Sequence, residues 1–129
     1  MRIDHIAIWT NNLEGLRSFY MRYFDASCSE IYHNHSKEFR SYFLTFDDYC
    51  KLEIMEMPNI PQSRNNALKQ FIGIIHFAIN AGSKGEVDRI TELLRKDGFK
   101  VISEPRITGD GNYESVILDP EGNRVEIMN

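Results

Sequence analysis

Short runs of alternating apolar and polar residues are separated by two segments with helical spacing, and this order occurs twice along the chain. Residues 3–9 alternate and are rich in β-branched side chains, which predicts a strand. Residues 13–24 place apolar side chains every three or four positions, which predicts an amphipathic helix with Asn11 or Asn12 as its N-cap. Three more strands are expected near residues 28–32, 39–46 and 51–57, with turns at residues 34–37 and 47–48.

The second half of the chain repeats this order. A strand at residues 74–80 precedes a helix near residues 85–96, and Gly98 is expected to cap the end of that helix. Three strands are then expected at residues 99–103, 113–118 and 124–128. Between the halves, residues 58–73 are rich in Pro, Asn, Gln and Ser, which is typical of a linker.

These elements predict an α+β protein whose 129 residues form one domain. Two tandem βαβββ modules are expected, at residues 1–57 and 74–129, joined by the linker at residues 58–73. We expect the strands to form a curved, cupped mixed sheet with the helices on its outer face.

One histidine and one glutamate of each half lie in matching contexts. His76 follows His5 by 71 positions, and Glu126 follows Glu53 by 73. The aliphatic neighbours of each point to the opposite face of the strand, so all four side chains are expected on the face that the helices leave uncovered. Imidazole nitrogens and carboxylate oxygens bind Zn, Ni, Co, Mn or Fe(II), and two His with two Glu form a neutral site for one such divalent ion.

Each of these residues also has an ordinary structural explanation. A single strand histidine is more often a hydrogen-bonded structural residue than a ligand, and a single strand glutamate is usually solvated. Their matching placement in both halves favours the metal site. Glu56 competes with Glu53, but strand parity places Glu56 on the helix-covered side or at a frayed strand end, which favours Glu53. His33 and His35 lie near a polar turn and are expected to be exposed loop residues.

Other side chains are expected near this site. Arg106 precedes a glycine-rich stretch and is suited to bind a substrate carboxylate or phosphate, although an ordinary turn before a strand explains the stretch equally well. The remaining residues expected to line the same cavity are Tyr113, Ser115 and Ile117 and, by the repeat, Ser41, Phe43 and Thr45.

Composition narrows the classes of partner. The chain has 42% hydrophobic and 26% charged residues and a formal net charge of −4, with a pI near 5.5. These values are typical of a soluble globular protein and give no reason to expect a nucleic-acid or membrane partner. No apolar run approaches the roughly 18 residues of a spanning helix, and the first residues read as a strand rather than a signal peptide. Cys28 and Cys50 are expected to be reduced thiols, so we expect a cytoplasmic protein.

The double βαβββ pattern, with His on each first strand and Glu on each last strand, resembles the vicinal oxygen chelate superfamily of glyoxalases, bleomycin-resistance proteins and dioxygenases. Residues 118–126, Leu-Asp-Pro-Glu-Gly-Asn-Arg-Val-Glu, carry the most specific part of the resemblance. The His/Glu/His/Glu set is similar to that of bacterial glyoxalase I. Dioxygenases and fosfomycin-type transferases of this superfamily typically use two His and one Glu, and epimerases typically place Gln where Glu53 stands.

The resemblance implies a metal-dependent lyase or isomerase of the lactoylglutathione lyase type, acting on a small oxygenated substrate. In glyoxalase I that substrate is the hemithioacetal of glutathione and a 2-oxoaldehyde, and the metal stabilises the enediolate formed when a carboxylate removes a proton from carbon. Glu126 and Glu53 would combine ligation with general-base catalysis. Where glyoxalase I usually has an Arg that helps to hold glutathione, this chain has Trp9. The Trp9 side chain either contacts a different substrate, as we also expect of Arg106 and Tyr113, or packs in the core.

A second class of function is consistent with the same residues. The chain is then a relative that binds a small molecule, such as an antibiotic, or a dioxygenase, without glyoxalase activity. In either case we expect a homodimer, because βαβββ units have open sheet edges and one uncovered face. In the resembling enzymes the metal site often lies at the subunit interface.

Overall fold

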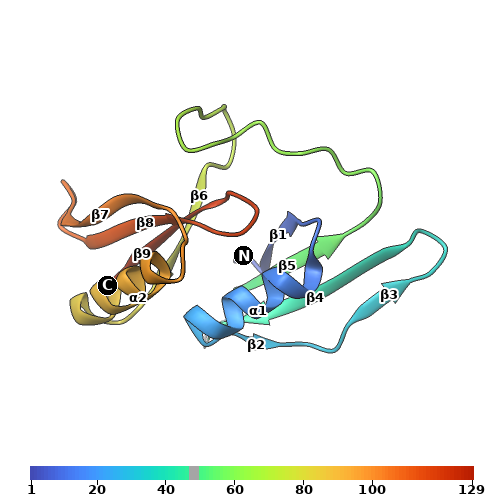
Figure 1. Ribbon diagram of the computed structural model, residues 1–129. Helices are drawn as coiled ribbons and strands as arrows, with labels where there is room; N and C mark the ends of the chain where they lie inside the picture. The colour runs from blue at the N-terminus through green and yellow to red at the C-terminus, as the bar shows by residue number, and fades with distance from the viewer. Residues whose placement is uncertain (47–49) are drawn as a thin grey trace. The chain divides into compact units, whose positions relative to one another are not determined.

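The computed structural model describes residues 1–46 and 50–129, which divide into two compact units, Met1–Gln62 and Ser63–Asn129. The boundary between the units falls inside the predicted linker. The described residues form two sheets and two helices, with one sheet and one helix in each unit (Figure 1). This arrangement confirms the predicted α+β class. The turn predicted at residues 47–48 lies outside the described residues.

The first unit contains a mixed sheet in which β1 (His5–Trp9) runs parallel to β5 (Lys51–Glu56). On its other side, β5 pairs antiparallel with β4 (Phe39–Thr45). Both β2 (Ser27–Cys28) and β3 (Tyr32–Asn34) pair antiparallel with β4. The single strand predicted near residues 28–32 is therefore two short strands.

Ser29 explains this interruption. Its hydroxyl accepts a hydrogen bond from the backbone N–H of Phe43 at 3.0 Å, although its own N–H still donates to the carbonyl of Phe43 at 2.9 Å. A side chain that binds the neighbouring strand in place of a backbone group breaks the regular ladder.

The second unit contains a mixed sheet in the order β6-β9-β8-β7. β6 (His76–Asn80) runs parallel to β9 (Arg124–Met128), and β8 (Tyr113–Leu118) pairs antiparallel with both β9 and β7. The edge strand β7 (Val101–Ile107) begins and ends later than the predicted strand at residues 99–103. It continues through Pro105 because an edge strand tolerates a residue without a backbone N–H, and its pairing with β8 shifts register twice.

The first helix begins where the sequence predicts, and the second begins one residue earlier than expected. Asn12 caps α1 (Leu13–Phe24) by accepting a hydrogen bond from the N–H of Gly15 at 2.9 Å. Ser83 caps α2 (Lys84–Lys96) in the same way through the N–H of Glu86. The C-cap of α2 is Asp97, and Gly98 follows with a φ of 90°, the left-handed geometry that glycine adopts most readily. Neither helix in the described part of the chain is long and apolar enough to cross a membrane.

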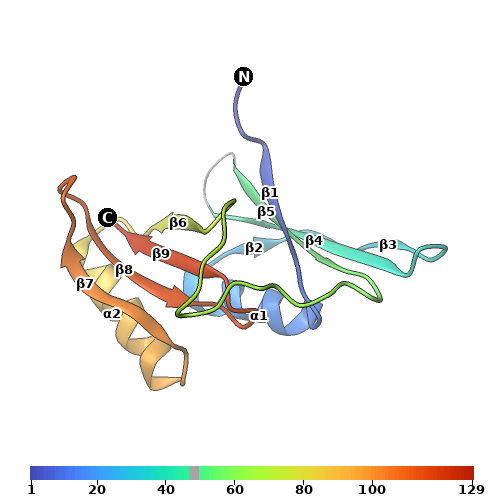
Figure 2. The same cartoon turned by 90° about the horizontal axis from the view of Figure 1, so that it is seen from above.

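Each helix lies against the sheet of its own unit (Figures 1 and 2). In both units the side chains that are almost completely buried come from the inner side of the helix and the facing side of the strands. In the first unit they are Leu13, Leu16, Phe19, Tyr20, Leu44, Leu52 and Ile54, and in the second Val87, Ile90, Leu94, Ile117, Val125 and Ile127.

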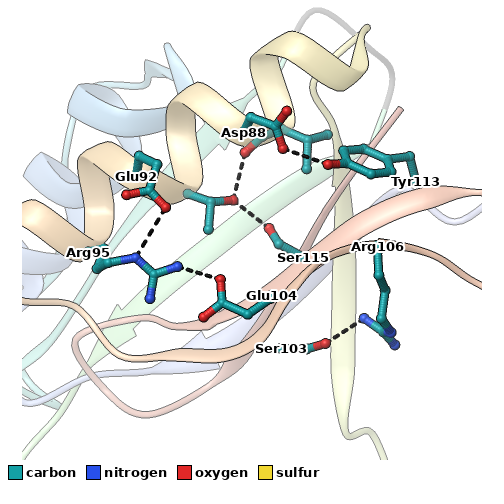
Figure 3. Close-up of polar contacts among 10 residues, drawn as sticks. Asp88, Glu92, Arg95, Ser103, Glu104, Arg106, Tyr113 and Ser115 are labelled. Atoms are coloured by element: carbon teal, nitrogen blue, oxygen red, sulfur yellow. Dashed lines mark hydrogen bonds and ion pairs between the residues drawn. The ribbon is translucent and has the colours of Figure 1, made fainter.

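A buried polar contact fastens α2 to its sheet. The hydroxyl of Thr91 donates to the carbonyl of Val87 at 2.6 Å, and so it accepts from the hydroxyl of Ser115 on β8, also at 2.6 Å (Figure 3). Both residues are fully buried. The contact therefore satisfies two hydroxyl groups that water does not reach.

Thr91→Val is expected to lower the free energy of unfolding by about 1–3 kcal/mol, because it leaves the Ser115 hydroxyl buried without its acceptor. Thr91→Val combined with Ser115→Ala is expected to lose less than the two single variants added together. Chemical denaturation of all three variants measures this coupling. Strictly additive losses would show that the two hydroxyls do not depend on each other.

Candidate metal centre

The first histidine–glutamate pair lies on β1 and β5. In the parallel register Glu53 is the partner of Ala7, two residues after His5, so that both side chains occupy the same face of the sheet. His5 Nε2 lies 3.9 Å from Glu53 Oε2. Glu53 is mostly covered, with 16% of its side chain exposed, whereas His5 is more open at 41%.

Asp4 orients the ring of His5. Its Oδ2 lies 3.1 Å from His5 Nδ1, and this hydrogen bond is the main cause of a lowered pKa for the Asp4 carboxyl. An ionised carboxylate accepts a hydrogen bond from Nδ1–H, and in that tautomer the lone pair of Nε2 is free and on the side of Glu53. Metal-binding histidines commonly have such a carboxylate at their second nitrogen.

The second pair has the same register on β6 and β9. Glu126 is the partner of Ala78, two residues after His76, and His76 Nε2 lies 3.3 Å from Glu126 Oε2. The exposed fractions are similar to those of the first pair, at 18% for the Glu126 side chain and 44% for the His76 side chain. Two ligands of one tetrahedral ion lie roughly 3.3–3.6 Å apart, so the second pair has the separation of metal ligands and the first is slightly wider.

All four side chains occupy the face predicted for them. The aliphatic residues that alternate with them, Leu52, Ile54, Val125 and Ile127, are buried on the helix-covered side. Glu56 lies on that side too, as predicted, where it forms an ion pair with Arg40. Within the described residues, no three His, Cys, Asp or Glu side chains are grouped closely enough to hold a metal ion.

Glu126 has the electrostatic surroundings of a basic carboxylate. Burial raises the pKa of Glu126 above its ordinary value; His76 opposes this rise and Glu114 adds to it. Glu114 occupies the same face, because its neighbour Val116 is the partner of Glu126, and its side chain is only 12% exposed. A carboxylate that holds its proton more tightly is a stronger base when ionised.

Arg106 lies beside this pair at the edge of the second sheet. It is the partner of Glu114 in the β7–β8 register, and its Nη2 lies 3.6 Å from Glu114 Oε1. Its Nη1 donates to the hydroxyl of Ser103 at 2.5 Å (Figure 3). The guanidinium therefore lies on the same face as Glu126, where its positive charge lowers the pKa of that carboxyl.

The expected positions of Tyr113, Ser115 and Ile117 are wrong. The hydroxyl of Tyr113 donates to Asp88 of α2 at 2.8 Å (Figure 3). Ser115 and Ile117 lie on the same helix-covered face, where both are buried. The spacing of 73 residues between Glu53 and Glu126 predicts the correct face. Applied to Phe43, this spacing gives Val116, so the even-numbered residues of β8 are expected on the face of Glu126. The side chains of β8 that share the face of Glu126 are therefore Glu114, Val116 and Leu118.

The corresponding residues of the first unit are placed as predicted. Phe43 is the partner of Glu53, and its ring meets that of His5 edge-on with centroids 5.5 Å apart. Ser41 and Thr45 share this face by alternation along β4. Trp9, the last residue of β1, shares the face of His5 and packs edge-on against Phe39 at 6.0 Å.

Two residues near the pairs were not anticipated from the sequence. Asp4 has no counterpart before His76, where Ile75 stands, so the repeat gives no signal for it. Glu114 is identified when the 73-residue spacing is applied to the residues of β8. His33 and His35, by contrast, are exposed as predicted, and their rings lie 3.8 Å apart. His35 lies in the turn, but His33 is part of β3 and not of a loop.

A cavity of about 510 Å³ in the first unit lies elsewhere. It is lined by His33, Arg40, Glu56 and the residues around Asn11 and Pro58, and it includes neither His5 nor Glu53. The Arg40–Glu56 ion pair neutralises its two most buried charges. The candidate ligands of the first unit, His5 and Glu53, are therefore on the open face of their sheet and not in this cavity.

Comparison with known proteins identifies relatives of this chain. The family described as "Glyoxalase/Bleomycin resistance protein/Dioxygenase superfamily" matches residues 2–127. A stretch of 60 residues is 37% identical to the uncharacterized protein YqjT of Bacillus subtilis (strain 168), and it covers 44% of this chain and 47% of that protein. The chain thus matches about half the length of this curated relative.

Two solved structures of glyoxalase I have a similar fold. The enzyme of Leishmania major, described as trypanothione-dependent, has a TM-score of 0.78 and 18% identity, covering 100% of this chain and 86% of that one. A V278E mutant of the Zea mays enzyme has a TM-score of 0.78 and 18% identity, covering 98% of this chain and 44% of that one. The chain therefore spans less than half the length of the maize enzyme.

Proposed function

We propose that this chain, which belongs to the Glyoxalase/Bleomycin resistance protein/Dioxygenase superfamily, is a metal-dependent lyase or isomerase of glyoxalase I type. The observation that carries the proposal is the matched pair of His and Glu in each unit, on the same face and in the same register. A single His–Glu contact has many structural explanations, whereas the same contact in two repeats supports a shared function.

The proposed metal ligands are His5, Glu53, His76 and Glu126, two from each unit. Two neutral imidazoles and two carboxylates suit one divalent ion, with Zn, Ni, Co, Mn and Fe(II) as candidates. The Asp4 contact supports this assignment, because it leaves His5 Nε2 available as a ligand. When bound, such an ion would stabilise negative charge that develops on the oxygens of the substrate.

Glu126 and Glu53 are the proposed proton-transfer groups. In the metal-free protein burial raises the pKa of Glu126, and its carboxylate is the proposed base that takes a proton from carbon. Glu53 is similarly well covered and lies beside His5, and by the repeat it is the second proposed proton-transfer group. Arg106, on the face of Glu126, is the proposed anchor for an anionic group of the substrate.

Exchange of a carbon-bound proton with solvent tests this function directly. Metal-loaded protein is incubated in D₂O with a panel of 2-oxoaldehyde–thiol adducts, and deuterium at the substrate carbon is followed by NMR. Metal-dependent exchange with at least one adduct is expected. Exchange with none of them, in protein that has bound its metal, would favour a small-molecule binding protein of the same superfamily.

We also propose that the protein is a homodimer. β1 and β6 lie at the edges of their sheets, where their outer backbone groups have no neighbouring strand within the unit. Such edges are commonly covered by a second subunit. Sedimentation equilibrium is expected to give twice the mass of 15.1 kDa at micromolar concentration. A fully metal-loaded monomer at that concentration would contradict the proposal.

A further inference from the structure

An aromatic patch lies at one end of the open face of the first sheet. It consists of Trp9, Tyr32, Phe39 and Met55, from strands β1, β3, β4 and β5 (Figure 1). Register places these side chains together: Trp9 is the partner of Met55, Met55 of Ser41, and Ser41 of Tyr32. All of them therefore share the face of His5 and Glu53.

The aromatic rings of the patch contact one another, but a large part of their surface is exposed. Phe39 meets Trp9 and Tyr32 edge-on, each with centroids 6.0 Å apart. Trp9 is nevertheless 39% exposed and Tyr32 56% exposed. Exposed aromatic rings held in a fixed geometry offer surface on which another ring gains stacked or edge-to-face contact.

The patch lies within reach of the proposed reaction site. Glu53 is the partner of Ala7 and Met55 is the partner of Trp9, so the patch begins two residues along the strands from Glu53. Two residues of a strand span roughly 7 Å. A short aliphatic spacer therefore bridges the distance between an oxygenated group at Glu53 and an aromatic group on the patch.

Charge defines the kind of group that fits. No member of the patch is charged. Arg40 on β4 points to the other face and forms an ion pair with Glu56, and Lys51 lies at the opposite end of the sheet face, two residues before Glu53 on β5. The uncharged surface of the patch therefore suits an uncharged ring.

We propose that the aromatic patch is a subsite for an uncharged, planar aromatic group of the substrate. The inference rests on the proposed function for the placing of the substrate's oxygenated end, and it replaces a peptide thiol by an aromatic substituent. A second protein is a poorer occupant, because a stable interface buries about 800 Å² and 20–30 residues on each side. The patch has four residues.

Trp9 provides the measurement, because it is the only tryptophan of the chain. Protein treated with EDTA is titrated with 3-phenylpropionamide and, separately, with 3-cyclohexylpropionamide, while tryptophan emission is recorded. The phenyl amide is expected to change the emission saturably and to bind about two- to tenfold more tightly than the cyclohexyl amide. Both probes lack vicinal oxygens and the protein lacks metal, so the result is independent of the proposed chemistry.

Variants locate the response. Phe39→Leu is expected to weaken binding of the phenyl amide about two- to tenfold, and Tyr32→Ser is expected to do the same from an exposed position that the fold tolerates. Phe71→Leu is the matched control, because Phe71 is exposed but lies in the second unit, and it is expected to bind like the unchanged protein.

Several outcomes would overturn the proposal. Equal binding of the two amides would show that the patch does not select an aromatic ring. Unchanged affinity in both Phe39→Leu and Tyr32→Ser would place the probe elsewhere. Emission that changes with protein concentration, and not with the probe, would identify the patch as a contact between copies of the chain. A failed proton-exchange assay beside a saturable response of Trp9 would refute only the proposed function.

Discussion

His76→Ala is expected to lower the affinity of the protein for a divalent metal by about 100-fold. Binding of zinc at four-ligand sites contributes about 10–16 kcal/mol, so that one ligand of four accounts for about 3 kcal/mol. A loss of that size corresponds to roughly two orders of magnitude in the dissociation constant. The fold is expected to survive, because 44% of the His76 side chain is exposed and its removal leaves the core of the second unit intact.

Competition with a chromogenic chelator measures this loss, with circular dichroism as the check on folding. His35→Ala is the matched control, because His35 is an exposed turn residue outside both pairs, and it is expected to bind metal like the unchanged protein. Full metal occupancy of His76→Ala under chelator challenge would remove His76 from the proposed ligand set.

Strand parity predicted the faces of the ligands correctly, because one rule applies along each regular strand. A strand turns alternate side chains to opposite faces, so the aliphatic positions around Glu53 and Glu126 were enough to place both carboxylates. The start of the first helix was also predicted correctly, since Asn12 is a cap that acts through a local hydrogen bond.

Strand parity predicted the wrong face for β8, because the register of that strand was assigned incorrectly. Tyr113 was assigned to the face of Glu126 without reference to the β8–β9 register, and a change of one residue reverses the face of every side chain in a strand. The split between β2 and β3 and the extension of β7 through Pro105 also depend on the neighbouring strand. Such pairings join distant parts of the sequence, so local pattern does not reveal them.

The aromatic patch shows how much of a candidate site depends on register. Trp9 was noticeable in the sequence as a departure from the Arg expected by resemblance, and both a substrate contact and a core position were consistent with it. Pairing of β1, β5, β4 and β3 places Met55 beside it and brings Phe39 and Tyr32 to the same face. Three-dimensional pairing thus turns one unusual residue into a surface with a defined chemical preference.

Glu126→Gln is expected to lower the rate of proton exchange by about 10²–10⁴-fold, the typical contribution of a general base. The amide keeps the size of the side chain and an oxygen beside His76, but it does not accept a proton from carbon. Because a general base acts on the proton that is transferred, the loss in rate is expected to exceed the loss in substrate binding.

Initial rates of solvent deuterium exchange, divided by the metal content of each sample, separate this effect from loss of the metal. Glu104→Gln serves as the matched control, since Glu104 is exposed on β7, where it pairs with Arg95 of α2, and is expected to leave the rate unchanged (Figure 3). If Glu126→Gln retains its metal and exchanges at the rate of the unchanged protein, the base is another group. Glu53→Gln is then the next variant, because Glu53 is the matching carboxylate in the first unit.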